Sequence, residues 1–308
     1  MTAPSVPSVP SVPSVPRRDD TEVAPMRPIL RYHGGKWRLA SWIISHFPEH
    51  RAYVESFGGG ASVLLRKPRS YAEVYNDLDH EVVNLFYVLR DPSMRSRLVE
   101  MIGFTPFARQ EFDDAYEVAD DPVESACRLL VLSHMGFGTA AMRSTRAGVR
   151  QRTGFRAHTT RSGTTPARDW GRFPNIVAQV GERFTGVVIE RMDALELMAR
   201  HDGLETLHYV DPPYPHSTRS NPARWNYRHE MTDDMHRTMA AWLRGLRGMV
   251  VLSGYACDLY DRELFPDWQR VEKPTHADGA RDRTEVLWLN YACAARLARR
   301  SSGSGAGK

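Results

Sequence analysis

The chain of 308 residues is predicted to be an α/β protein with a doubly wound, mostly parallel sheet. Three observations support this prediction. Short apolar runs typical of buried strands alternate with segments whose apolar residues recur at helical spacing. One run is followed by the three glycines at residues 58–60, and another ends in Asp211-Pro212-Pro213. Strands that alternate with helices and end in such turns are typical of a parallel sheet.

The first half of the chain contains two strand and helix units. Residues 39–47 have the pattern of an amphipathic helix, and a strand follows at residues 53–55. After the glycines, Val63-Leu64-Leu65 is expected to begin a helix, and residues 73–75 form the next strand. The helix at residues 81–89 then buries one face. That face consists of Val82, Leu85, Phe86 and Leu89.

The second half resumes the alternation. Thr232 is placed to cap a helix through residue 246, with Asp233 and Asp234 at its positive end. The remaining elements are a strand at 186–190, a short helix at 195–198, and strands at 207–210, 249–253 and 285–291. The repeated order predicts neighbouring parallel strands whose carboxyl ends share one edge of the sheet.

Residues 105–185 interrupt this order. The first part carries helix-like segments such as residues 122–132, and residues 136–172 are rich in Gly, Ser, Thr and Arg. Arginine pairs with phosphates and reads guanine with two hydrogen bonds, so this segment is typical of nucleic-acid contact. The alternative is a solvated arginine surface. The candidate DNA-binding residues are Arg143, Arg146, Arg150, Arg152 and Arg156.

The segment Leu207-His208-Tyr209-Val210-Asp211-Pro212-Pro213-Tyr214 carries the clearest chemical signal. Two consecutive prolines cannot continue a ladder or a helix, so the chain leaves the sheet there in a stiff turn. The turn places a carboxylate, rigid carbonyl groups and an aromatic ring at the end of a strand, where open α/β sheets bind ligands. A carboxylate and a carbonyl can each accept a hydrogen bond from an exocyclic amino group while the ring stacks on its base. The alternative is a proline-stiffened surface loop.

Four motifs, in the same order, resemble the Dam-type DNA adenine methyltransferases. Asp211-Pro212-Pro213-Tyr214 resembles the catalytic motif of the amino-group DNA methyltransferases, and its Asp is the residue typical of the adenine enzymes. Residues 53–63 resemble the glycine loop for the cofactor, and residues 31–37 resemble the aromatic-x-Gly-Gly-Lys element. Residues 72–79 resemble the second strand with its terminal acid. The resemblance covers residues 27–292; Tyr32 replaces a common Trp, and His33 stands at a position that is often small or Pro.

This resemblance implies a seven-stranded methyltransferase (Rossmann-like) sheet with one antiparallel strand, and it implies roles for individual residues. The implied catalytic residues are Asp211, Pro212 and Tyr214. The implied residues for the cofactor S-adenosyl-L-methionine are Tyr32, Lys36, Phe57, Gly58, Gly60, Asp77, Asp193 and Asp211. Asp77 and Asp193 have an alternative role as loop or helix caps. Asn76, Asp79 and Glu55 are weaker candidates, and no metal site is expected.

The resemblance also divides the chain. Residues 26–104 and 186–295 would form the catalytic domain, and residues 105–185 a mainly helical, loop-rich target-recognition insert. Residues 1–25, with their Ser-Val-Pro repeats, are expected to be a disordered tail, and residues 296–308 a flexible one.

Composition agrees with this reading. A net charge of +4 and a pI near 9.0 suit a polyanionic partner, here double-stranded DNA. Three widely spaced cysteines form neither a zinc signature nor a disulfide framework. No apolar stretch approaches the roughly 20 residues of a membrane span, so a cytoplasmic protein without membrane contact is expected.

The predicted function is therefore site-specific methylation of a flipped adenine at N6 in DNA. An RNA adenine or DNA cytosine-N4 methyltransferase would share the Asp211 corner. A protein-glutamine methyltransferase usually carries Asn at the position of Asp211, and a catalytically dead DNA-binding relative would keep the fold. The DNA recognition sequence and a partner restriction nuclease stay open at this point.

Overall fold

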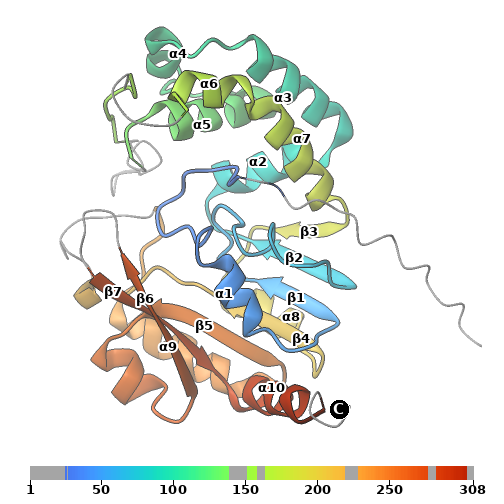
Figure 1. Ribbon diagram of the computed structural model, residues 1–308, viewed down its shortest axis with the longest axis vertical. Helices are drawn as coiled ribbons and strands as arrows, with labels where there is room; N and C mark the ends of the chain where they lie inside the picture. Colours follow the sequence, from blue (N-terminus) through green and yellow to red (C-terminus); the bar gives the residue numbers. More distant parts are fainter. Residues whose placement is uncertain are drawn as a thin grey trace, which may run out of the picture.

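The computed structural model describes residues 25, 27–138, 151–157, 164–218, 228–276 and 282–303. Figure 1 shows a sheet with helices on its two faces and a layer of helices beyond the β3 edge of the sheet. Nearly all of the expected N-terminal tail lies outside the described residues, so its predicted disorder stays a prediction.

The sheet has seven strands in the order β3-β2-β1-β4-β5-β7-β6. The strands from β3 to β5 pair in parallel, whereas β7 runs antiparallel to both β5 and β6. The bounds are β1 Ala52–Glu55, β2 Ala72–Asn76, β3 Val187–Glu190, β4 Thr206–Val210, β5 Met249–Tyr255, β6 Gln269–His276 and β7 Asp282–Leu289. The doubly wound sheet with one antiparallel strand is thus confirmed.

Helices bury both faces of this sheet. On one face, α1 (Ala40–Ser45), α2 (His80–Arg90) and α10 (Tyr291–Gly303) pack in the cluster that contains Tyr209. On the other face, α8 (Ala194–Arg200), α9 (Asp233–Gly245) and the π-helix η3 (Leu259–Leu264) pack with Val210. Because successive strand side chains point to opposite faces, an apolar run such as residues 207–210 is what a strand covered on both sides requires.

The cap that the sequence predicts at Thr232 is present, and Asp79 supplies a second cap that was not predicted. The Thr232 hydroxyl oxygen accepts a hydrogen bond from the backbone N–H of Met235 at 3.3 Å, and α9 begins one residue after Thr232. Asp79 caps α2 in the same way, accepting from the backbone N–H of Glu81 at 3.1 Å. Each cap satisfies an N–H group that has no partner within its helix.

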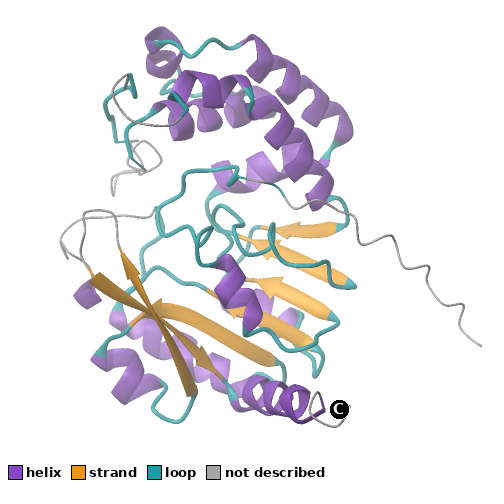
Figure 2. Cartoon of the chain, viewed as in Figure 1, coloured by secondary structure: helices purple, strands orange, loops and turns teal. Residues whose placement is uncertain are grey.

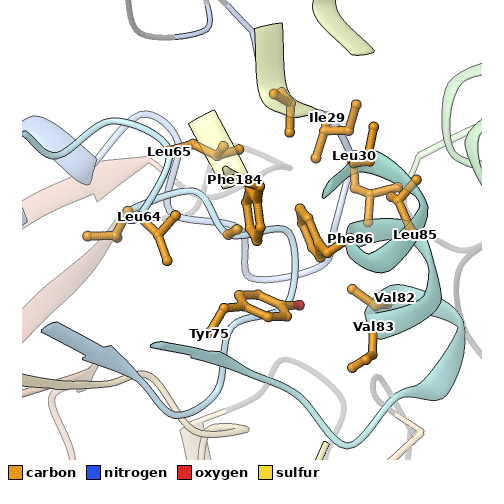
Figure 3. Close-up of a cluster of buried hydrophobic side chains, with 14 of the residues drawn as sticks. Ile29, Leu30, Leu64, Leu65, Tyr75, Val82, Val83, Leu85, Phe86 and Phe184 are labelled. Atoms are coloured by element: carbon orange, nitrogen blue, oxygen red, sulfur yellow. The ribbon is translucent and has the colours of Figure 1, made fainter. Parts of the chain in front are cut away.

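The layer beyond β3 is mainly helical, as expected, and contains none of the seven sheet strands (Figure 2). It comprises α3 (Pro92–Phe104), α4 (Arg109–Asp114), α5 (Pro122–Met135), α6 (Pro166–Gly171) and α7 (Phe173–Phe184). The layer joins the sheet through an aromatic cluster (Figure 3), in which the rings of Phe86 and Phe184 stack with centroids 4.3 Å apart and Tyr75 packs 4.6 Å from Phe86. This cluster fixes the helical layer to β2 and α2.

A buried ionic triad makes a second junction between the sheet and the layer. Glu73 on β2 accepts hydrogen bonds from Lys67 at 2.6 Å and from Arg183 on α7 at 2.6 and 3.0 Å. Arg183 also donates to the backbone carbonyl of Leu64 at 2.7 Å. The triad therefore ties the turn after the glycines to the last helix of the layer.

One predicted helix is wrong. Residues 61–67 form turns instead of the helix expected to begin at Val63. Ala61 has a φ of 52°, a left-handed conformation that breaks the chain direction at the start of the segment. Pro68 disfavours the helical conformation of the residue before it at the other end. The few residues between them are too short a run for a stable helix.

The carboxyl-terminal end also differs from expectation. Strand β6 was not predicted, because its sequence is polar and contains Pro274; the structure places it at the edge of the sheet, where proline is tolerated. The last strand ends at Leu289, and α10 begins at Tyr291. Residues 296–303 of the expected tail are helical, and residues 304–308 lie outside the described residues, so the flexibility of the tail stays a prediction.

Candidate active site

A cavity of about 290 Å³ opens at the carboxyl ends of the parallel strands. It is lined by the glycine turn after β1, Asp77 after β2, the start of α8 and the Asp211 corner after β4. The aromatic-Gly-Gly-Lys segment and residues 228–231 complete its wall. The structure therefore brings all four motifs of the sequence analysis to one place, at the edge where open α/β sheets bind ligands.

Asp211 presents one carboxylate oxygen to protein partners and leaves the other without one. Its Oδ2 lies 2.9 Å from the Lys36 ammonium. Its Oδ1 is buried and has no hydrogen-bond partner among the described residues. Burial raises the pKa of Asp211 to about 6, although the positive charge of Lys36 opposes this effect. An unsatisfied buried acceptor beside a cavity can accept a hydrogen bond from water or from a bound ligand.

Lys36 is positioned by several contacts. Its ammonium donates to the carbonyl of Gly34 at 2.9 Å, lies 3.8 Å from a carboxylate oxygen of Glu285 and stands 4.8 Å from the centre of the Tyr214 ring. The resemblance implies that Lys36 contacts the cofactor, and the structure adds a direct ion pair between Lys36 and the carboxylate of Asp211. A buried ammonium beside Asp211 favours the ionised form of that carboxyl group.

The glycine turn is shaped by close contacts. A Cβ atom on Gly58 would lie 2.1 Å from the Tyr75 ring, and one on Gly59 would lie 2.8 Å from the Tyr32 ring. Gly59 also has a φ of +46°, which side chains rarely adopt. Phe57, Gly58 and Gly60 line the cavity, as does Tyr32. The turn is therefore a narrow backbone surface against which a flat ligand can lie.

Two further acids of the cavity have structural partners. Asp77 accepts from the backbone N–H of Gly59 and from that of Asp79, both at 2.8 Å, and burial raises its pKa to about 6. Asp193 caps α8 by accepting from the backbone N–H of Leu195 at 2.8 Å. Both side chains line the cavity. The capping alternatives therefore hold, and the cofactor roles of both residues stay predictions.

Tyr214 is more deeply set than a freely stacking ring would be. Its hydroxyl group donates to Glu285 at 2.6 Å, and its ring meets that of Tyr255 edge to face at 4.7 Å. The side chain is 8% exposed, whereas Asp211 and Pro213 line the cavity. Its predicted contact with a base remains a prediction, and the structure gives the ring a fixed orientation.

The structure describes two of the five candidate DNA-binding arginines, and their contact with DNA stays a prediction. Arg143, Arg146 and Arg150 lie outside the described residues. The exposed guanidinium of Arg152 lies 4.9 Å from the centre of the Tyr116 ring. Arg156 is half-buried and donates to the backbone carbonyl of His134 at 3.0 Å, so it also holds its segment against the end of α5.

Two site residues escaped the sequence analysis. Glu285 on β7 accepts from Tyr214 and from Ser253, the latter at 2.9 Å. Arg228 pairs with Asp79 at 3.0 Å and closes one side of the cavity. The sequence does contain a sign of Glu285, because a lone acid directly before the apolar run Val286-Leu287-Trp288-Leu289 is unexpected in a buried strand.

Glu55, a weaker candidate of the sequence analysis, has structural partners. It accepts hydrogen bonds from the Tyr53 hydroxyl and from the Leu64 backbone N–H, and burial raises its pKa to about 8.

The strand order, with β7 between β5 and β6, and the glycine turn at the cavity are those of the Rossmann-like methyltransferase fold. Residues 32–125 match the model of the D12 class N6 adenine-specific DNA methyltransferase family. This match agrees with the resemblance to adenine-specific DNA methyltransferases that the sequence motifs show, and it spans less than a third of the chain. No curated protein matches the chain. The family match ends at residue 125, before the Asp211 corner. Among the described residues, no helix is long and apolar enough to cross a membrane.

Proposed function

We propose that the protein transfers a methyl group from S-adenosylmethionine to N6 of an adenine that is flipped out of double-stranded DNA at a specific site. The observation that carries this proposal is the buried Oδ1 of Asp211, which has no partner among the described residues, in the lining of the cavity beside the glycine turn. An exocyclic amino group is a donor of the kind that this oxygen lacks.

The cavity fits the proposed cofactor. The glycine turn leaves no room for a Cβ at Gly58, and Tyr32 packs directly on the turn. We assign Tyr32, Lys36, Phe57, Gly58, Gly60, Asp77 and Asp193 to this site, with Asp77 and Asp193 offering carboxylate oxygens to hydroxyl or amino groups. Bound there, S-adenosylmethionine would supply a methyl group that its sulfonium already activates.

The chain's own task is to orient the adenine amine. Asp211 Oδ1 accepts a hydrogen bond from one amino hydrogen and the Pro212 carbonyl accepts from the other, so the nitrogen lone pair is drawn out of the ring plane. Lys36 fixes the second oxygen of Asp211 at 2.9 Å and keeps the carboxylate ionised. Positioning of this kind is worth roughly 7–11 kcal/mol of the barrier. The base has to leave the duplex first, because its amino group is paired there.

The test is expression in a host that lacks DNA methylation, followed by single-molecule mapping of modified bases. We expect N6-methyladenine at one short sequence in cells that carry the protein and none in cells that carry Asp211→Ala. Cytosine-N4 methylation, or methylation of RNA with unmodified DNA, would replace the proposal with one of the alternatives. Unmodified nucleic acid beside a folded protein that fails to bind S-adenosylmethionine would indicate a dead relative.

A pH dependence follows from Asp211. Its carboxylate works as an acceptor only when it is ionised, and burial places its pKa at about 6. We therefore expect kcat/KM to fall about tenfold per pH unit below pH 6 and to be level above it. The profile is measured by transfer of labelled methyl to unmethylated DNA from pH 5 to pH 8. A rate that stays level down to pH 5 would contradict the role of Asp211.

A second prediction separates the ring of Tyr214 from its hydroxyl group. Tyr214→Phe keeps the ring and loses the 2.6 Å hydrogen bond to Glu285, so we expect a loss of about tenfold in kcat. Tyr214→Ala also loses base stacking worth roughly 1–3 kcal/mol, so its kcat should be lower again. Single-turnover rates on one DNA substrate measure both. Equal losses in the two variants would show that the ring does not contact the base.

A further inference from the structure

We infer that Glu285 is a positioning residue for methyl transfer, because its buried carboxylate sets the places of Tyr214 and Lys36 around Asp211. The inference rests on the proposed function and adds a residue to it. Glu285 belongs to β7, outside the stretch that matches the family model. Its side chain is 2% exposed and does not line the cavity, so it acts through its neighbours and not by touching the adenine.

The first line of evidence is the hydrogen-bond arrangement. A single oxygen of Glu285 accepts from the Tyr214 hydroxyl at 2.6 Å and from the Ser253 hydroxyl at 2.9 Å. Bonds to an ionised acceptor are the short and strong ones, so the Tyr214 ring has little freedom to turn. The register of the sheet places Glu285 opposite Tyr255, whose ring packs edge to face on Tyr214. Strand β7 thus holds the Tyr214 ring at its hydroxyl group through Glu285, and strand β5 holds it at its side through Tyr255.

The second line of evidence is the shared ammonium. Lys36 lies 2.9 Å from Asp211 Oδ2 and 3.8 Å from the same Glu285 oxygen. Two carboxylates therefore attract one ammonium from different sides. We expect this shared attraction to help hold the Lys36 ammonium on Oδ2 of Asp211, so that Oδ1 stays open to the adenine amine.

The third line of evidence is the cost of the arrangement. A buried carboxylate at the start of an apolar strand loses its hydration, and apolar residues of similar volume would pack there without that loss. Functional sites are where such local costs persist. The negative charge of Glu285 also raises the pKa of Asp211, so it acts directly on the group proposed to bind the amine.

The test is Glu285→Gln in the intact chain, assayed by single-turnover methyl transfer to unmethylated bacterial DNA. Gln keeps an acceptor for Tyr214 and Ser253 but removes the charge. We expect kcat to fall by about tenfold or more, while the Kd of S-adenosylmethionine measured by calorimetry changes less than about threefold. We also expect the acidic limb of the pH profile to move to lower pH, because the raised pKa of Asp211 loses one of its causes.

The pH shift is specific because the other groups around Asp211 are unchanged in this variant. The titratable groups that interact with Asp211 are Lys36, Tyr214, Tyr209, Tyr260, Glu55 and Glu285. Glu285→Asp serves as the conservative companion, since it retains the charge with a shorter reach. The acidic limb of the pH profile of Glu285→Asp should stay near that of the wild type, while its kcat should be lower. This result would separate the effect of the charge of Glu285 from the effect of its position.

The matched control is Glu272→Gln on the neighbouring strand β6, an exposed glutamate whose loss should leave both kcat and the pH profile unchanged. A double variant with Tyr214→Phe should lose less than the product of the single losses, because both changes break the same contact. Wild-type rate and an unmoved acidic limb in Glu285→Gln would overturn the inference. A loss of kcat with an equal rise in the cofactor Kd would overturn it too. An inactive wild-type protein would instead refute the proposed function.

Discussion

Asp211→Asn should lower kcat by on the order of 10²–10³-fold or more, the scale seen when one preorganised hydrogen-bond partner of a transition state is removed. Asn keeps the shape of the corner, but its neutral amide is a weaker acceptor and no longer balances the Lys36 ammonium at 2.9 Å. The lost interaction strengthens as the amine becomes nucleophilic, so the Kd of S-adenosylmethionine should stay within about tenfold.

The measurement pairs single-turnover rates with calorimetric cofactor binding. Asp267→Asn is the control, because this exposed aspartate pairs with Arg244 on the surface, away from the cavity. It should match the wild type in both measurements. A rate for Asp211→Asn within a few-fold of the wild type would remove Asp211 from the mechanism, whatever happens to binding.

Glu73→Gln should lower the free energy of unfolding by about 3–5 kcal/mol, since it leaves two buried cations with one weak acceptor. Burial alone would raise the pKa of Glu73, but Arg183 and Lys67 hold it below its ordinary value. A lowered pKa means that the ionised carboxylate stabilises the folded state above its ordinary pKa of 4.5, and that this contribution is lost as the pH falls through the folded-state pKa. The wild type and Glu73→Gln should therefore converge in stability at acidic pH.

Urea unfolding at pH 7 and at pH 4 measures this difference. The control is Glu182→Gln on the same helix as Arg183, where a 66% exposed glutamate makes a 3.7 Å surface pair with Arg95. Its loss should change stability by less than about 0.5 kcal/mol. A change of under 1 kcal/mol for Glu73→Gln would mean that water reaches the triad.

The sequence was sufficient to predict the parallel strands and the location of the cavity because both depend on local signals. The apolar run that stops at Asp211-Pro212-Pro213 allows few structures other than a buried strand with a stiff exit. The same holds for Thr232, whose place before Asp233 and Asp234 identifies the start of a helix, as the structure confirms. Glycines followed by an acidic strand end likewise predicted where the cavity lies.

The remainder depends on contacts between distant residues. Glu285 is 249 positions from Lys36 in the numbering, and no spacing rule connects them. The left-handed Ala61 breaks a segment that has a helical pattern, and the edge position of β6 makes its Pro274 harmless. Arg156 belongs to an arginine-rich segment whose composition predicts DNA contact, yet its guanidinium donates a hydrogen bond to the carbonyl of His134 within the protein.

The sheet order has a consequence for synthesis. Although β7 is the last strand to be made, it lies between β5 and β6 and supplies Glu285. A growing chain that has reached residue 281 already carries every residue assigned to the cofactor, yet β5 has an open edge and β6 has no strand beside it. The edge of β5 therefore stays unpaired until residues 282–289 have been made, and until then it is open to pairing with other chains.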